Sequence, residues 1–252
     1  MCLILVAWKT DPDYPLVLAA NRDEFHHRPA QPLHWWQDKP NVLAGRDLQA
    51  GGTWLGAYRS GRVAAVTNYR EEQPRRQGRQ SRGESVTEFL MDDDSPYTFS
   101  RSIDGDSYAG YSLLTADSGE LCYVSNRGDA ATLLSPGIYG LSNASLDTPW
   151  PKLRRTRDAF RKIIEAGDAN ETSLMRLMDD RQVAPADEVE AGLLPFTRAR
   201  AITAPFIVTP EYGTRCTTVL LRDRSGQINI SERRFDSAGR KIGDSRLGFT
   251  SN

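Results

Sequence analysis

Short apolar runs separated by turn-forming residues dominate the N-terminal half of the chain. Residues 3–8 and 16–20 are two such runs around a Pro/Asp turn, a pattern that predicts a β-hairpin. Residues 53–58 and 62–67 flank Ser60-Gly61 and predict a second hairpin. The same pattern predicts two further strand pairs, at residues 111–116 with 121–125 and at residues 216–222 with 227–235. Neighbouring strands with tight turns favour antiparallel sheets over a parallel arrangement.

Helical periodicity is confined to fewer segments. Residues 152–165 place Leu153, Phe160 and Ile164 on one face and predict an amphipathic helix. Residues 171–180 and 83–91 predict two shorter ones.

Two stretches are predicted as loops. Residues 28–42 contain three prolines, and residues 70–82 are polar and rich in arginine. The chain shows neither an internal repeat nor a clear linker, so we expect one domain over residues 1–252 that combines strands with a few helices, an α+β protein.

Composition narrows the classes of function. With 39% hydrophobic and 26% charged residues the 252-residue chain is a folded globular protein, and its net charge of -1 argues against nucleic acid as a partner. No apolar run approaches the ~20 residues of a membrane span, and the short apolar residues 2–8 indicate a buried strand and not a secretion signal. The three cysteines and three histidines lack metal-ligand spacing, so we expect no metal site and a reducing, cytoplasmic setting.

Cys2 is the first candidate catalytic residue. Aminopeptidases remove Met1 when the second residue is small, which would leave a thiol and an α-amine on one residue. The amine, with a pKa of roughly 7.7–8.0, can take the proton of the thiol, with a pKa of roughly 8.5. The alternative is that Cys2 is an inert, small apolar residue at the start of a strand.

A charged tetrapeptide, residues 21–24, follows the second predicted strand. If the first two strands form a hairpin, this tetrapeptide lies close to Cys2. Asp23 would then orient the α-amine, while Arg22 would lower the pKa of the thiol or bind a substrate anion. The alternative is a solvated charged turn.

Two asparagines stand near predicted strands, Asn68 after residues 62–67 and Asn143 after Leu141-Ser142. A side-chain amide donates hydrogen bonds to the oxyanion that develops in acyl transfer. The alternative is that both serve turns, which asparagine favours.

Taken in order, the motifs resemble a known family. They are Met1-Cys2, Asn21-Arg22-Asp23-Glu24, residues 51–56, residues 140–143 with Pro149-Trp150-Pro151-Lys152, and Tyr212-Gly213-Thr214-Arg215. This combination is similar to the NRDE family, also called the transport and Golgi organisation 2 family. The chain departs from that family at residues 196–201, where Arg198 and Arg200 replace a glycine and acidic residues.

The resemblance implies a fold and a set of site residues. The family is grouped with the N-terminal-nucleophile hydrolases, which implies a four-layer αββα sandwich with two antiparallel sheets. A more distant similarity to bile-salt hydrolases and penicillin V acylases implies Cys2 as the nucleophile. The residues assigned beside it are Asp23, Asn68 and Asn143 as catalytic, and Arg22, Asn21, Arg215 and Trp54 as substrate-binding.

Two functions follow from this resemblance. The first is an amidohydrolase that acts on a non-peptide amide of a small molecule, with Cys2 as nucleophile and without a cofactor. The second is a haem or lipid binding or trafficking protein that uses the same fold without turnover. The family's reported roles and the aromatic residues between positions 25 and 36 motivate this second hypothesis. The sequence does not predict an oligomeric state.

Overall fold

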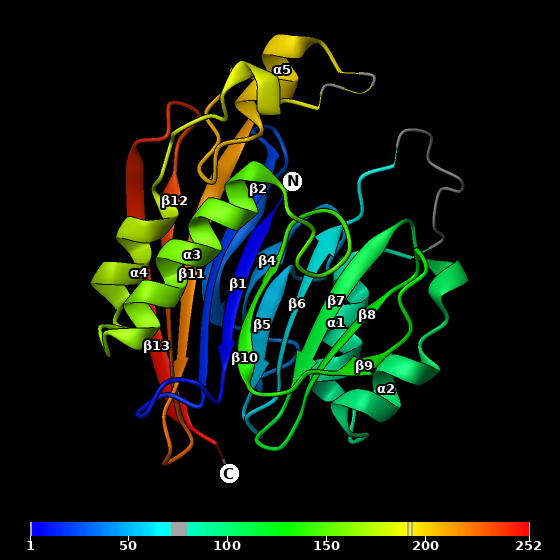
Figure 1. The fold of residues 1–252 in the computed structure, drawn as a ribbon. Helices are drawn as coiled ribbons and strands as arrows, with labels where there is room; N and C mark the ends of the chain where they lie inside the picture. Colours follow the sequence, from blue (N-terminus) through cyan, green and yellow to red (C-terminus); the bar gives the residue numbers. More distant parts are fainter. Residues whose placement is uncertain (1, 72–79, 191, 193, 252) are drawn as a thin grey trace.

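Two β-sheets packed face to face form the centre of the molecule (Figure 1). The computed structural model describes residues 2–71, 80–190, 192 and 194–251. Helices cover the outer face of each sheet, so the layers follow in the order helix, sheet, sheet, helix. This arrangement confirms the α+β fold expected from the strand and helix patterns and the αββα sandwich that the family resemblance implied.

The first sheet has six antiparallel strands in the order β10-β1-β2-β11-β12-β13. Their bounds are β10 (Gly137–Leu141), β1 (Leu3–Trp8), β2 (Leu16–Phe25), β11 (Tyr212–Arg222), β12 (Gln227–Phe235) and β13 (Lys241–Thr250). The second sheet has seven antiparallel strands in the order β3-β4-β5-β6-β7-β8-β9. Their bounds are β3 (Ala30–Trp35), β4 (Val42–Asp47), β5 (Leu55–Tyr58), β6 (Val63–Asn68), β7 (Tyr111–Ala116), β8 (Leu121–Ser125) and β9 (Thr132–Leu133).

The helices fall into two groups. α3 (Pro151–Glu165) and α4 (Glu171–Met178) cover the first sheet, and α1 (Arg82–Met91) and α2 (Pro96–Ser102) cover the second. α5 (Phe196–Ala201) and two short 3-10 helices, at Gly105–Ser107 and Ala186–Glu188, complete the described elements. Within the described ranges, no helix is long and apolar enough to cross a bilayer.

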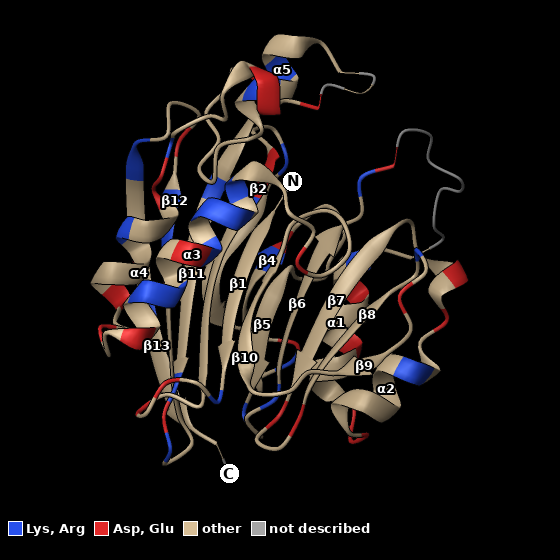
Figure 2. Ribbon diagram, in the orientation of Figure 1, with Lys and Arg blue, Asp and Glu red and all other residues tan. Residues whose placement is uncertain are grey.

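β1 is a continuous apolar run because its side chains alternate between two faces that are both buried. Ile4, Val6 and Trp8 pack into the cluster between the sheets, whereas Leu3 and Leu5 pack into the cluster under α3 and α4. Successive side chains of a strand point to opposite faces, and both faces of β1 are buried. Figure 2 shows the corresponding charge distribution, in which charged residues gather on the helices and at the strand ends.

All four predicted strand pairs form antiparallel hairpins. The second strand is longer than expected: β2 continues through residues 21–24 to Phe25, because β11 pairs with it from Leu16 to Phe25. The predicted helices at residues 83–91, 152–165 and 171–180 correspond to α1, α3 and α4.

The loop predicted at residues 28–42 is wrong over part of its length. β3 occupies Ala30–Trp35 and pairs with β4, with a register shift between Gln31 and His34. Pro32 is tolerated there because β3 is the edge strand of its sheet, where a missing N–H breaks no ladder on the open side. Of the other predicted loop, residues 72–79 lie outside the described residues, and α1 begins at Arg82.

Candidate functional site

Cys2 stands immediately before β1, at the upper end of the sandwich in Figure 1. On one side β1 pairs with β2, with Leu3 opposite Asn21, and on the other side it pairs with β10, with Ile4 opposite Leu141. The Ser142 hydroxyl donates a 3.0 Å hydrogen bond to the carbonyl oxygen of Cys2. The fold therefore holds Cys2 between the tetrapeptide of β2 and the end of β10.

A cleft of about 570 Å³, part of it open to solvent, lies at this position. Its lining comes from the start of β1, the end of β2, β4, the segment before β5, β6 and the first turn of α1. The lining residues are Cys2, Arg22, Asp23, Glu24, Arg28, Asp47, Thr53, Trp54, Val66, Asn68, Ser81, Arg82 and Gly83. The structure thus brings together Cys2, Arg22, Asp23, Trp54 and Asn68, five of the residues predicted for the site.

The Cys2 thiol has a raised pKa. Burial is the main cause and the nearby carboxylate of Asp23 adds to it, while the Asp23 main-chain N–H and the positive charge of Arg22 act in the opposite direction. The protonated thiol therefore dominates at neutral pH. Nucleophilic chemistry at Cys2 requires a base that removes this proton.

Asp23 is buried beside Cys2, with 3% of its surface exposed. Its Oδ1 accepts a 2.6 Å hydrogen bond from the Thr214 hydroxyl, and its carbonyl oxygen accepts one of 2.8 Å from the Tyr212 hydroxyl. Burial raises the pKa of Asp23 to about 6, although the charges of Lys152 and Arg22 and the Thr214 hydrogen bond favour the ionised form. Asp23 therefore changes charge close to neutral pH.

The hydroxyl of Thr214 reaches Asp23 because of an irregularity in β11. Thr214 pairs with Asp23 and Cys216 pairs with Arg22, so Arg215 is an additional residue between two consecutive pairs. Such a β-bulge shifts the alternation of side chains along a strand.

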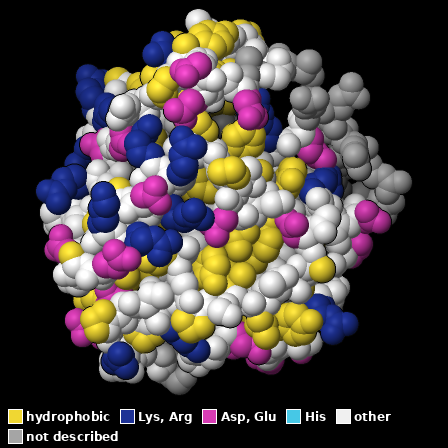
Figure 3. All heavy atoms as spheres, in the orientation of Figure 1, with side chains coloured by type: hydrophobic (Ala, Val, Ile, Leu, Met, Phe, Trp, Pro, Cys, Tyr) yellow, Lys and Arg dark blue, Asp and Glu magenta, His cyan; other side chains and the backbone are white. Residues whose placement is uncertain are grey.

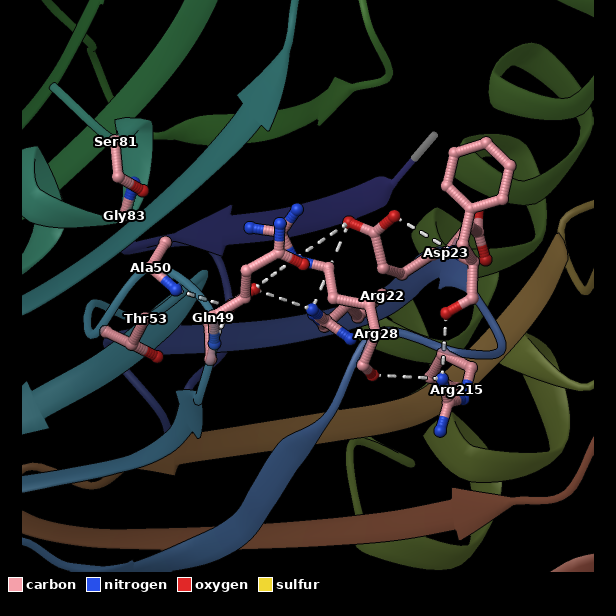
Figure 4. A network of polar contacts seen from close by, with 12 residues as sticks. Arg22, Asp23, Arg28, Gln49, Ala50, Thr53, Ser81, Gly83 and Arg215 are labelled. Carbon is pink, nitrogen blue, oxygen red and sulfur yellow. Dashed lines mark hydrogen bonds and ion pairs between the residues drawn. The ribbon is translucent and has the colours of Figure 1, made fainter. Parts of the chain in front are cut away.

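Arg22 is positioned by Asp47 and Trp54. Oδ2 of Asp47 accepts hydrogen bonds from Arg22 Nη2 at 3.0 Å and Arg28 Nε at 2.6 Å, and the Arg22 guanidinium stacks 4.3 Å from the centre of a Trp54 ring. Figure 4 shows Arg22 and Arg28 close together in this network of hydrogen bonds and ion pairs. Arg28 holds the pKa of Asp47 below its ordinary value despite partial burial, which keeps Asp47 ionised. Both arginines also lie within 4.0 Å of Glu24 Oε2, so this wall of the cleft holds two guanidinium groups paired with two carboxylates.

Asn143 and Asn68 meet at the edge of the cleft. Asn143 has a left-handed backbone with φ of 58°, and its Nδ2 donates a 2.9 Å hydrogen bond to the carbonyl oxygen of Asn68. The Arg70 N–H donates to the carbonyl oxygen of Asn143 at 2.7 Å. An amide nitrogen carries two hydrogens, so one N–H of Asn143 remains for a second acceptor. The Asn68 side chain itself is exposed.

The structure does not bring Asn21 and Arg215 to the cleft. Asn21 is buried in β2, where its Nδ2 donates to the carbonyl oxygens of Met178 and Pro205, at 2.8 and 2.9 Å. Arg215 Nη1 donates to the carbonyl oxygens of Phe25 and His26, both at 2.9 Å. The Asn21 side chain therefore connects β2 to the segments at Met178 and Pro205, and the Arg215 side chain connects β11 to the end of β2.

The aromatic residues between positions 25 and 36 also lie away from the cleft. Trp36 is buried under α1 with its Nε1 bonded to the carbonyl oxygen of Ala44, and Trp35 packs edge-on against Phe249. His26 Nε2 lies 2.9 Å from the carbonyl oxygen of Thr209. Over the described part of the chain, no three His, Cys, Asp or Glu side chains group as metal ligands.

Two basic residues were not assigned to the site from the sequence, which favoured a solvated loop for Arg82 and contained Lys152 only as part of a motif. Arg82 lies in the cleft, where burial lowers the pKa of its guanidinium and the charges of Cys2 and Glu24 oppose this. The sequence signal was Ser81 followed by Glu84, which marks a helix start at Arg82 and not a loop. Lys152 is buried near Asp23 and Cys2, and burial lowers the pKa of its ammonium group. The sequence feature that pointed to Lys152 was its place just after Pro151, in the first turn of a helix. A cation is disfavoured there because the helix dipole has its positive end at the N-terminus.

Close backbone contact fixes Arg82 relative to the cleft. A Cβ atom on Gly52 would lie 2.5 Å from the carbonyl carbon of Gly83, and the Thr53 N–H donates to the carbonyl oxygen of Gly83 at 3.2 Å. Only glycine allows the two backbones to approach this closely. The first turn of α1 is therefore held directly against the wall that carries Trp54.

Sequence comparisons connect most of the chain to one group of proteins. A family model described as Transport and Golgi organisation 2 matches residues 1–237. The Transport and Golgi organization protein 2 homolog of Bos taurus is 38% identical over 258 residues, and the alignment covers 92% of each chain. The corresponding homolog of Homo sapiens is 36% identical over 258 residues, with the same coverage.

A solved structure shares the fold at much lower sequence identity. The Caenorhabditis elegans N-acylethanolamine-hydrolyzing acid amidase ortholog aligns with a TM-score of 0.50 and 12% identity, covering 87% of this chain and 92% of that one. At this identity the likeness concerns the fold alone. The two proteins thus share the arrangement of two sheets between helices.

Proposed function

Because this chain belongs to the Transport and Golgi organisation 2 family and has the fold of N-terminal-nucleophile hydrolases, we propose that it hydrolyses a non-peptide amide bond. One observation carries this proposal: Cys2 lines a cleft together with the buried carboxylate of Asp23 and three arginines. A thiol at the first position of a processed chain, beside a group that holds its amine, is an arrangement suited to nucleophilic catalysis.

The reaction proceeds in two steps. After removal of Met1, the α-amine of Cys2 takes the thiol proton, and sulfur attacks the amide carbonyl carbon to give a tetrahedral oxyanion. The C–N bond then breaks, the ammonium group returns its proton to the leaving amine, and a thioester remains on Cys2. In the second step the free amine activates a water molecule, which hydrolyses the thioester to a carboxylic acid and regenerates the thiol.

The neighbouring residues have separate roles in this scheme. The ionised Asp23 carboxylate holds and orients the Cys2 ammonium group. The second N–H of Asn143 donates to the developing oxyanion. Arg22 and Arg82 stabilise the thiolate, because each guanidinium interacts favourably with a negative charge on Cys2.

Intact-mass spectrometry tests the central step. We expect the purified protein to have lost the mass of Met1. N-acyl aminocoumarins of graded chain length should release one equivalent of aminocoumarin as one acyl group is added to Cys2, before the thioester is hydrolysed. Peptide mapping after rapid acid quenching locates the adduct. A purified chain that keeps Met1, or an adduct on Cys122 alone, contradicts the mechanism.

We expect the decrease of kcat/KM toward acid pH to follow the protonation of Asp23. Burial raises the pKa of Asp23 to about 6, so the carboxylate is protonated below this pH and ionised above it. Because only the ionised form holds the Cys2 ammonium group, kcat/KM should rise with pH around this value. Thr214→Val removes a hydrogen bond that favours the ionised form, and it should move the midpoint to higher pH.

Asp23→Asn provides the matched comparison. It keeps the shape of the side chain but cannot titrate, so its kcat/KM should be low and flat across the same pH range. An acid limb that persists unchanged in Asp23→Asn would assign the titration to another group.

A further inference from the structure

A second pocket of about 420 Å³ opens beside the cleft, between α5 and the first turn of α3. Asn143 and Lys152 line it together with Trp150, Pro151, Ala199 and Ile202, so much of its wall is apolar. In Figure 3 a hollow bordered by hydrophobic and acidic side chains lies on this face, below α5. The exposed Glu188 and Glu190 line the pocket as well, and Glu188 is bonded to Arg154 at 2.9 Å.

Two buried hydrogen-bond donors in this wall have no acceptor among the described residues. Lys152 is 3% exposed, and its Nζ makes no hydrogen bond within the described ranges. The buried indole Nε1 of Trp150 makes none there either. Both groups can only donate, and a buried donor without an acceptor costs stability. A ligand that fills the pocket and offers acceptors removes this cost.

The first turn of α3 adds to the positive character of the pocket. Trp150 at its N-cap provides no side-chain cap, and the first turn contains no acidic residue. By contrast, α1, α2 and α4 are capped by the side chains of Ser81, Ser95 and Asn170. An uncapped helix start presents free N–H groups and the positive end of the helix dipole. Arg70 also lines the pocket and contributes further positive charge.

We propose that this pocket binds the carboxylate of a small acid with an apolar body, with Lys152 Nζ and Trp150 Nε1 as donors. The carboxylate supplies the acceptors that both donors lack and places a negative charge at the start of α3. The apolar body packs on Pro151, Ala199 and Ile202. Because the carboxylates of Glu188 and Glu190 also line the pocket, a second negative charge on the ligand is disfavoured, which favours a carboxylate over a dianionic phosphate.

Calorimetric titration of the Cys2→Ala protein with octanoate tests the site without any turnover, so that it stands or fails separately from the hydrolase mechanism. We expect saturable one-to-one binding of octanoate, and weak or undetectable binding of octanol, which has the same chain without the charge. Lys152→Met should weaken octanoate binding by about 10-fold or more, as expected for loss of a charge-assisted hydrogen bond. Lys162→Met, an exposed lysine on the same helix, should leave the affinity unchanged.

Trp150→Phe provides a second variant that removes only the indole N–H, and it should weaken octanoate binding by a few-fold. It keeps the test decisive if Lys152→Met fails to fold, which circular dichroism reports. Equal binding of octanol and octanoate, or undiminished affinity in the variants of residues 150 and 152, overturns the proposal. Tighter binding of octyl phosphate than of octanoate overturns the assignment of a carboxylate.

Discussion

Cys2→Ser will reduce amide turnover by about three orders of magnitude or more, because the hydroxyl that replaces the thiol is a far weaker nucleophile. Serine is also small, so removal of Met1 and the α-amine are preserved and only the attacking atom changes. The measurement is kcat/KM on the aminocoumarin amide that the unmodified protein cleaves fastest. A thiol-directed acylating reagent should at the same time label Cys2 in the unmodified protein and nothing in the cleft of the variant.

Cys122→Ala is the matched control for this loss. Cys122 is buried in β8 of the other sheet and does not line the cleft, so the control should keep its turnover while losing one thiol. Turnover of Cys2→Ser within a few-fold of that of the unmodified protein would remove Cys2 from the mechanism. In that case the cleft would be a binding site and not a centre of covalent catalysis.

Phe160→Ala will lower the free energy of unfolding by about 3–5 kcal/mol, the range measured for phenylalanine truncation in protein cores. Phe160 is 0% exposed and lies in the cluster that packs α3 and α4 against the first sheet. Truncation leaves a cavity that the strands of the sheet cannot close, because both of their faces are packed. Urea unfolding followed by circular dichroism measures the change.

Arg161→Ala tests whether this loss comes from burial. Arg161 is the next residue of the same helix and is exposed, so its replacement should change the free energy of unfolding by no more than about 0.5 kcal/mol. Equal losses in the two variants would mean that α3 contributes through helix propensity and not through packing. The four-layer description of the core would then be wrong at this helix.

Local sequence patterns were sufficient to predict the strands that are buried on one or both faces. The bounds of β1, β7 and β8 agree with the predicted ones, because each is a short apolar run that ends at turn-forming residues. No bounds were predicted from the sequence for β10 or β13, for two different reasons. β10 contains two glycines in five residues, and β13 is polar and largely exposed at the edge of its sheet. Pairing with β1 and β12 maintains these strands, and such tertiary pairing leaves no local signal.

The same distinction applies to the site. The proximity of Cys2 and Asp23 follows from one hairpin, so local reasoning was enough to predict it. The position of Asn143 depends on β10, which returns to pair with β1 from more than a hundred residues further along the chain. Arg82 and Lys152 depend on how two helices pack on the sheets. Residues brought in by packing are thus the ones that a single sequence did not assign to the site.

Arg215, the additional residue in β11, determines which side chains of that strand lie on each side of the sheet. If strict pairing continued from Cys216 and Arg22 without the bulge, Arg215 would pair with Asp23. Thr214 would then lie opposite Glu24, with its hydroxyl on the other side of the sheet from Asp23. A member of this group in which β11 pairs with β2 without the bulge must therefore hold the acidic side chain of β2 by a group other than the hydroxyl of residue 214.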